Sequence, residues 1–138
     1  MTTTRVNISS ASDFEDVVGY SRAVRVGNQV VVSGTTAAVA GGGAVGGDDI
    51  GAQTREVLAR IATALEQAGA SVRDVVRTRM FVTDIARWPE VAAAHTEVFG
   101  TIRPAASMYE VTALIAPDLL VEIEADAIID DGALPSKP

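Results

Sequence analysis

Apolar and polar positions alternate along parts of the chain and recur at helical spacing along others. Alternating β-branched residues are typical of strands, and apolar residues three or four positions apart are typical of helices. The predicted strands cover residues 5–8, 21–26, 29–34, 75–82, 105–114 and 119–129, and the predicted helices cover residues 50–68 and 88–99. This order indicates an α+β fold built on one sheet.

Turn residues support several of these boundaries. A Gly-Asn dipeptide at 27–28 lies between two β-branched runs and predicts a tight hairpin. Residues 35–47 are small and rich in glycine, which indicates a loop. Asp48 or Asp49 can cap the helix that follows, and Gly69 is suited to end it.

The two predicted helices each carry one apolar face, so we expect both to cover the same side of the sheet. The other side is predicted to be polar, because Glu122, Glu124 and Asp126 alternate with an apolar row. In the strand at 75–82, one face is expected to hold Val76, Thr78, Met80 and Val82, and the other Arg77, Arg79 and Phe81. A solvated face and an oligomer interface with Arg–Glu pairs both fit this pattern.

Composition narrows the classes of function. The 138 residues fit one domain at residues 1–130, with a polar tail at 131–138 expected to be flexible. Eleven basic residues against 18 acidic ones give a net charge of −7, and there are only one Trp, two Tyr and three Phe, so nucleic-acid binding is not expected. Cysteine is absent, which excludes disulfides and thiol catalysis. The chain shows no signal-peptide pattern and no membrane-spanning run, so we expect a cytoplasmic protein without membrane contact.

Five short segments, taken in order, resemble the Rid family (reactive intermediate deaminases), also called the YjgF family. They are Gly19-Tyr20-Ser21-Arg22-Ala23, residues 30–35, residues 75–84, residues 103–107 and residues 121–125. The similarity extends from about Tyr20 to Ile128. It implies a chorismate-mutase-like fold, with a mixed six-stranded sheet and two helices packed on one face. It also implies a homotrimer that binds small-molecule ligands in clefts between subunits, which would cover the polar face of the sheet.

The resemblance also implies an activity. Enzymes of the Rid family hydrolyse reactive enamines and imines, such as 2-aminoacrylate, to ketoacids and ammonia, and they need no cofactor or metal for this. A non-catalytic ligand-binding or regulatory trimer with the same cleft is the alternative. The endoribonuclease activity ascribed to some relatives is disfavoured by the acidic charge and the few aromatic residues.

Site residues carry over from the family by position. Glu122 matches the glutamate suggested to orient the attacking water, and Tyr20 matches a tyrosine that closes the cleft. The resemblance implies further ligand contacts at Ser33, Gly34, Ser107 and Met108.

Ala106 is the main departure from the family's pattern. The deaminases have arginine there, in Pro-Ala-Arg-Ser, whereas this chain has Pro-Ala-Ala-Ser at 104–107. Alanine cannot hold a carboxylate, so 2-aminoacrylate fits poorly and a ligand without an α-carboxylate is expected. Arg22, Arg79 and Arg103 can each supply a substitute guanidinium. An exposed surface position is the favoured alternative for Arg22 and Arg103, and an interface ion pair is the alternative for Arg79.

Two other features have weaker functional interpretations. His95 is the only histidine, and a surface or half-buried place on its helix is favoured over acid–base catalysis. One histidine without cysteine does not predict a zinc site. Residues 41–46 match Gly-x-Gly-x-x-Gly, but they lie in the long glycine-rich segment, so a flexible loop is favoured over a phosphate site.

Overall fold

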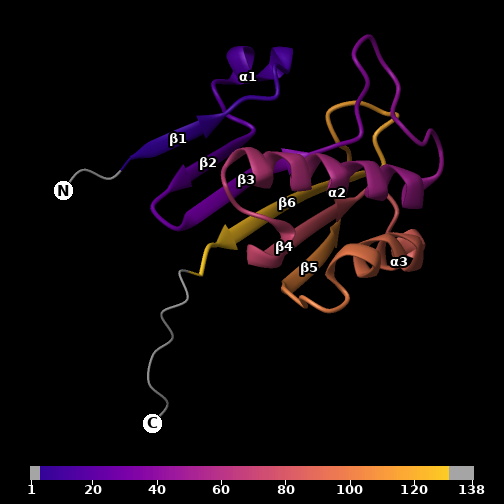
Figure 1. The fold of residues 1–138 in the computed structure, drawn as a ribbon. Coiled ribbons are helices and arrows are strands. Elements are labelled where there is room, and N and C mark those ends of the chain that lie inside the picture. The colour runs from indigo at the N-terminus through magenta and orange to yellow at the C-terminus, as the bar shows by residue number, and fades with distance from the viewer. Residues whose placement is uncertain (1–3, 131–138) are drawn as a thin grey trace.

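The last strand of the chain lies near the centre of a six-stranded sheet. The computed structural model describes residues 4–130. The strands are β1 (Arg5–Ile8), β2 (Ala23–Val26), β3 (Gln29–Thr35), β4 (Val75–Val82), β5 (Ala105–Glu110) and β6 (Val121–Ile128), and their order in the sheet is β1-β2-β3-β6-β4-β5 (Figure 1). Neighbours are antiparallel except β4 and β5, which are parallel. The predicted mixed α+β sheet is therefore confirmed.

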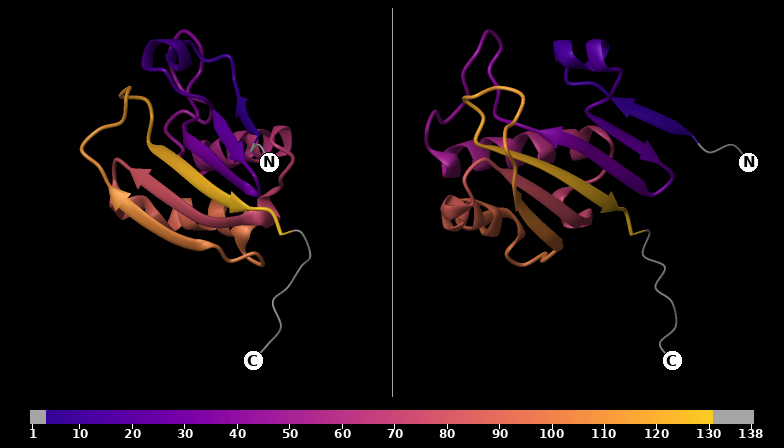
Figure 2. Two further views of the ribbon diagram at one scale, coloured as in Figure 1. Left: turned by 90° about the vertical axis from the view of Figure 1, so that its left-hand side faces the viewer. Right: turned by 180° about the vertical axis from the view of Figure 1, so that it is seen from behind.

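Two helices, α2 (Ile50–Gln67) and α3 (Trp88–Phe99), cover one face of this sheet and leave the other face open (Figure 2). Asp49 caps α2, since its carboxylate accepts a hydrogen bond from the Ala52 amide at 3.0 Å. After the helix, Gly69 adopts a left-handed backbone with φ of 83°. The structure thus confirms both predicted helices and shows that Asp49, of the two candidate aspartates, is the capping residue.

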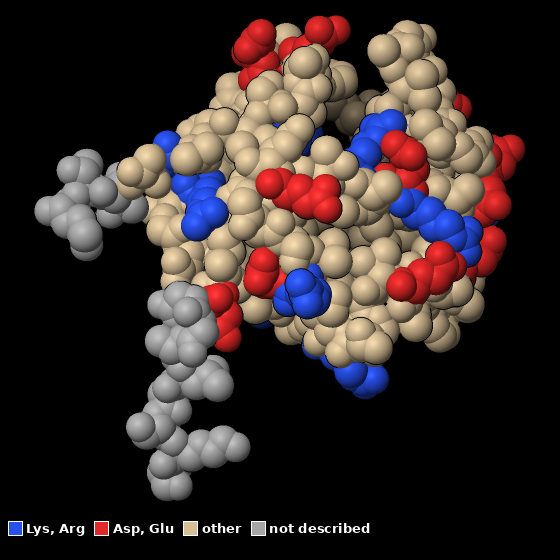
Figure 3. All heavy atoms as spheres, in the orientation of Figure 1, with Lys and Arg blue, Asp and Glu red and all other residues tan. Residues whose placement is uncertain are grey.

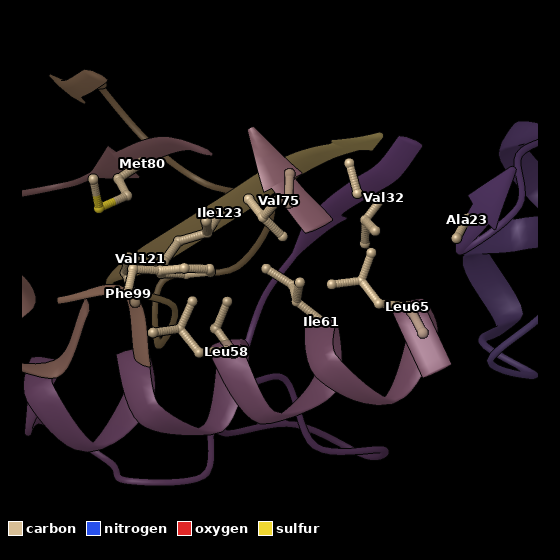
Figure 4. Packing of buried hydrophobic residues seen from close by; sticks show 14 of the residues in the cluster. Ala23, Val32, Leu58, Ile61, Leu65, Val75, Met80, Phe99, Val121 and Ile123 are labelled. Carbon is tan, nitrogen blue, oxygen red and sulfur yellow. The ribbon is translucent and has the colours of Figure 1, made fainter. Parts of the chain in front are cut away.

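The core lies between the sheet and these helices. Leu58, Ile61 and Leu65 point from α2 toward side chains of the sheet such as Val32 and Ile123 (Figure 4). All five are almost completely buried. Full burial of such a side chain contributes roughly 1.5–3 kcal/mol, so this contact is a main source of stability.

A third α-helix, α1 (Asp13–Val18), was not predicted from the sequence. Its six residues span too few turns to show a helical period. Local hydrogen bonds hold it instead, because the Glu15 carboxylate accepts from both the amide and the hydroxyl of Ser10, at 2.9 and 2.6 Å. Two single turns of 3-10 helix, Val72–Asp74 and Ile85–Arg87, complete the helical elements of the described residues.

Two further sequence predictions need correction. Val76 is 43% exposed and Val75 is 3% exposed, because a bulge between Val75 and Arg77 shifts the alternation of β4 by one residue. From Thr78 onward the alternation is as predicted. The last two strands are shorter than predicted, and the chain between them, residues 111–120, forms a loop.

No helix within residues 4–130 is long and apolar enough to span a bilayer. The predicted flexible tail at residues 131–138 lies outside the described residues.

Candidate functional site

A wide, open hollow lies where β3 leaves the sheet. It occupies about 1570 Å³ between α1, the glycine-rich loop, α2 and the loop before β6. In the space-filling view it is the dark gap between the two upper lobes (Figure 3). Seven of its lining residues belong to the segments that resemble the Rid family: Tyr20, Arg22, Ser33, Gly34, Thr35, Glu122 and Glu124. The structure thus brings both predicted catalytic residues and two of the predicted ligand contacts to one place.

The close approach of β6 to β3 places the Glu122 carboxylate. The pairing of the two strands shifts between Val32 and Thr35, so Gly34 lies in an irregular part of the ladder. A Cβ atom added to Gly34 would collide with Oε2 of Glu122. A side chain at this position would therefore force the Glu122 carboxylate to move, whereas the backbone itself does not call for glycine, since the φ of Gly34 is not in the left-handed region.

Arg22 is half-buried in the hollow instead of lying exposed on the surface. Its Nη1 donates hydrogen bonds to the Gly34 carbonyl at 2.7 Å and to the Thr35 hydroxyl at 2.8 Å. Its Nη2 donates to the Tyr20 hydroxyl at 3.1 Å, and the guanidinium carbon lies 5.5 Å from the centre of the tyrosine ring. Arg22 and Tyr20 thus form one rigid unit beside Gly34. The sequence offered Arg22 as a substitute guanidinium but did not predict these contacts, because the partners Gly34 and Thr35 lie on β3.

The Ser33 hydroxyl already has a partner. It donates to the Ser21 carbonyl at 2.6 Å and joins the ends of the two hairpin strands. Ser33 therefore fixes the wall of the hollow. His95 does not approach it, because the imidazole lies on the helix-covered side, with Nε2 3.0 Å from the Thr78 hydroxyl. The His95 ring also packs on Phe99, with centroids 4.7 Å apart, which confirms a half-buried helical position.

Glu122 has the electrostatics of a proton-transfer group. Among residues 4–130 no hydrogen bond reaches its half-buried carboxylate. Burial raises the pKa of Glu122, the positive charge of Arg22 opposes that rise, and the charge of Glu124 adds to it. A carboxylate without a bound donor and with a raised pKa can accept a proton from water and return it.

Arg79 is held by an ion-pair cluster on the open face of the sheet. Its Nη1 lies 3.2 Å from Oε1 of Glu124 and 3.3 Å from Oδ2 of Asp126. Of the two interpretations of Arg79, a ligand contact and an ion pair, the structure shows an ion pair, formed within one chain. This arginine is therefore committed to two carboxylates, and it does not line the hollow.

The remaining predicted ligand contacts lie elsewhere, on β5 at the sheet edge or just before it. They are Arg103, Ala106, Ser107 and Met108, and none of them lines the hollow. Ala106 pairs with Thr78, whose side chain is buried on the helix side, whereas Glu122 lies on the open side. Arg103 is exposed and has a φ of 59°. Within one chain, Ala106 and Glu122 therefore face opposite sides of the sheet.

The glycine-rich loop does not form a phosphate-binding turn at a helix start. It folds back on itself through a bridge between Ala38 and Ala44, and Gly41, Gly42 and Gly43 have positive φ at its tip. No group of three or more potential ligand side chains in the described part of the chain is placed to hold a metal ion.

Comparison with known proteins gives consistent results. The family model described as Endoribonuclease L-PSP matches residues 10–129. The crystal structure of Rv2704 from Mycobacterium tuberculosis, described as a member of the YjgF/YER057c/UK114 family, is similar with a TM-score of 0.84 and 62% identity, covering 91% of this chain and 100% of that one. The 3-aminoacrylate deaminase RutC of Acinetobacter baylyi is 36% identical over 104 residues, 75% of this chain and 82% of that protein.

A second deaminase is similar to the same extent. The 2-iminobutanoate/2-iminopropanoate deaminase of Salmonella typhimurium is 35% identical over 112 residues, which are 79% of this chain and 86% of that protein. The family model spans nearly all of the described chain, and these relatives share its fold or most of its length. The chain therefore belongs to the Rid (YjgF) family.

Proposed function

We propose that the protein hydrolyses a small imine or enamine to a carbonyl compound and ammonia, in clefts between the subunits of a homotrimer. The observation that carries the proposal is the Glu122 carboxylate, which lies in the hollow beside Arg22 with no hydrogen bond from residues 4–130 and with a raised pKa. Two of the similar proteins are named as deaminases of this chemistry.

The chemistry needs one group that moves a proton. Water held by Glu122 adds to the carbon of the C=N bond, and its proton passes to the carboxylate as the new C–O bond forms. Glu122 then returns the proton to the nitrogen, which gives a carbinolamine. It next takes the proton of the new hydroxyl and passes it to the amine, so that the C–N bond breaks, the carbonyl forms and ammonia leaves. An enamine first becomes the imine by taking a proton on carbon and losing one from nitrogen. Tyr20 borders the same space and restricts access of bulk water.

A cleft between subunits explains how two separated groups of residues can meet. Ala106 and Met108 lie on the edge strand and on the sheet face opposite Glu122, so one ligand can touch both groups only if they come from different chains. The open face also exposes Val31, Tyr109 and Ile128, which a neighbouring subunit would cover. In a homotrimer each subunit has two such neighbours.

A non-catalytic binding trimer is the second candidate, and Ala106 favours it, because β5 offers no charge at this position. A nuclease is disfavoured by the lining of the hollow. Five acidic residues line it, namely Asp13, Glu56, Asp118, Glu122 and Glu124, against the two arginines Arg22 and Arg60. Such a surface repels a phosphate backbone.

Ammonia release tests the proposed hydrolysis. An amino-acid oxidase generates 2-imino acids in the assay, and we expect the wild-type protein to release ammonia faster than buffer alone. Glu122→Gln is expected to lower the rate by about 10²-fold or more, as is usual for loss of a general base. Glu66→Gln is the control, because Glu66 is exposed on α2 and does not line the hollow. A wild-type rate equal to the buffer rate would contradict hydrolysis and leave the binding function.

Restoring the family's arginine provides a second test. Ala106→Arg adds a guanidinium to the exposed edge strand without replacing a buried side chain. If the rest of the cleft is intact, turnover of 2-aminoacrylate should rise above that of the wild type. An unchanged rate would indicate that β5 does not border the ligand.

A further inference from the structure

We infer that Arg22 binds the negatively charged group of the ligand, so that the site selects small monoanionic compounds. The inference rests on the proposed function in taking the hollow as the ligand site. It gives this chain an anion-binding group on the β2–β3 side of the cleft, whereas β5 carries the uncharged Ala106.

The two arginines of the hollow differ in their partners. Arg60 forms an ion pair with Glu56, with Nε 2.7 Å from Oε2, and its Nη1 donates to the Thr36 carbonyl at 2.8 Å. Within residues 4–130, Arg22 has no carboxylate within ion-pair distance, and its hydrogen bonds all go to uncharged oxygens. Arg22 is therefore a half-buried cation whose charge no ion pair neutralises, which is the condition under which an incoming anion is bound most strongly.

The guanidinium of Arg22 is also fixed in place and partly unused. Hydrogen bonds to Gly34, Thr35 and Tyr20 hold its plane. Nε and one N–H of Nη2 have no acceptor among the described residues. Nε and Nη2 share the edge of the guanidinium with which arginine pairs with the two oxygens of a carboxylate. Because the side chain is already ordered, little entropy is lost when the anion binds.

Two of the five acidic residues that line the hollow are paired with arginines, so they repel an anion bound at Arg22 less strongly than unpaired carboxylates would. Glu124 is paired with Arg79, and Glu56 is paired with Arg60. Burial raises the pKa of Glu122, so its negative charge is less favoured than that of an exposed carboxylate when an anion binds nearby. Arg22 donates to the Gly34 carbonyl, and the Glu122 carboxylate occupies the space that a side chain at Gly34 would fill. The anionic group and the reacting C=N group of a ligand must therefore be close together, as they are in 2-imino acids.

Binding of matched charged and neutral probes tests the inference. The probes are 2-oxobutanoate and its amide, 2-oxobutanamide, measured by ligand-observed NMR on the full chain. We expect the wild type to bind the carboxylate at least tenfold more tightly than the amide, with a preference that falls as NaCl is added. Arg22→Gln should weaken carboxylate binding tenfold or more and change amide binding less than twofold. Arg55→Gln is the control, because Arg55 forms an ion pair with Glu97 on the surface and does not line the hollow, and it should change either affinity less than twofold.

Each outcome decides the inference. Equal wild-type affinities for the two probes would overturn it without any variant, which covers the case in which Arg22→Gln fails to fold. A folded Arg22→Gln that keeps the wild-type preference would overturn it as well. Arg22→Lys keeps the charge and loses the paired donors, so its preference should lie between those of the wild type and the Gln variant. A carboxylate preference without ammonia release would contradict the hydrolysis and leave the role of Arg22 intact.

Discussion

Two residues set the geometry of the hollow, and each acts through a neighbour. Gly34 lacks the atom that would push Glu122 away, and Arg22 fixes Tyr20 and the Gly34 carbonyl. Neither residue moves the proton in the proposed hydrolysis, although Arg22 is also the inferred anion-binding group. The geometry of the hollow should therefore change when a small side chain is added at Gly34 as well as when the guanidinium of Arg22 is removed.

Gly34→Ala should displace the Glu122 carboxylate and impair the site. The added methyl collides with the end of a flexible side chain that can move away, so we expect a loss of about 1 kcal/mol or less in the free energy of unfolding, measured by urea denaturation, and a lower rate of ammonia release. The double variant Gly34→Ala/Glu122→Ala removes the colliding group and should recover most of that loss. Equal stability of the single and double variants would show that the collision is relieved in another way.

Glu122→Gln should make the protein more stable at pH 8 while abolishing the proposed activity. The folded protein raises the pKa of Glu122 through burial, so its stabilising contribution is present below the unfolded pKa and is lost as pH rises through the folded pKa. The uncharged variant avoids that loss, and its advantage should shrink as pH approaches 4. Urea midpoints between pH 4 and pH 8 measure this difference.

Glu97→Gln is the control for this prediction, because the pKa of Glu97 is shifted in the direction opposite to that of Glu122. A hydrogen bond from Arg55 lowers the pKa of Glu97, so removal of this carboxylate should not stabilise the protein at pH 8. If both variants respond alike, burial of Glu122 is not the cause of its effect.

Among the elements, the two long helices α2 and α3 were the easiest to predict, whereas the short helix α1 and the ends of the strands were the hardest. The apolar face of α2 and its glycine stop are properties of a long local pattern, which sequence alone displays. The bulge at Val76 depends on the pairing of β4 with β6, and α1 depends on a carboxylate reaching back to Ser10. Both arise from contacts that a periodic pattern does not contain.

Asp49→Ala should destabilise α2 and Asp48→Ala should not. Only Asp49 accepts the hydrogen bond from the Ala52 amide among the two, and loss of such a cap costs about 1 kcal/mol. Thermal unfolding followed by circular dichroism measures the difference. A comparable effect of Asp48→Ala would indicate that general charge near the helix start matters more than the cap.

The contact of α1 with the preceding loop should depend on pH. Hydrogen bonds from Ser10 lower the pKa of Glu15 to about 2, so this carboxylate stabilises the fold above its unfolded pKa of 4.5, and the contribution is lost as pH falls through about 2. At pH 5, Glu15→Gln should speed hydrogen exchange at the Ser10 amide. Asp16→Asn is the control on the same helix and should leave that exchange unchanged, whereas equal exchange in both variants would contradict the contact.

For the whole molecule, the open face of the sheet is the feature that most needs a partner. It combines exposed apolar side chains with the Arg79 ion-pair cluster, and nothing in the described chain covers it. The alternation of acidic residues in β6 was sufficient to predict this face. Which β5 and β6 residues lie near one ligand was not predictable, since that depends on strand order and on how chains assemble.

Val31→Lys should weaken the proposed trimer. Val31 is 45% exposed and lies on the open face, opposite Asp126 in the neighbouring strand. Val45→Lys is the matched control, because Val45 is 41% exposed and belongs to the glycine-rich loop. Analytical ultracentrifugation should show three subunits for the wild type and the control, and smaller species for Val31→Lys at the same concentration. A trimeric Val31→Lys would place the subunit contact on another surface.

The position of β6 constrains how the chain can fold as it is synthesised. The meander β1-β2-β3 and the pair β4–β5 are complete before residues 121–128 leave the ribosome, yet they touch in the sheet only through β6. Until then, each half has an unpaired strand edge and an uncovered apolar surface. The two halves therefore cannot join before residues 121–128 are available, and any nascent chain that is released before residue 128 lacks the complete strand that unites them.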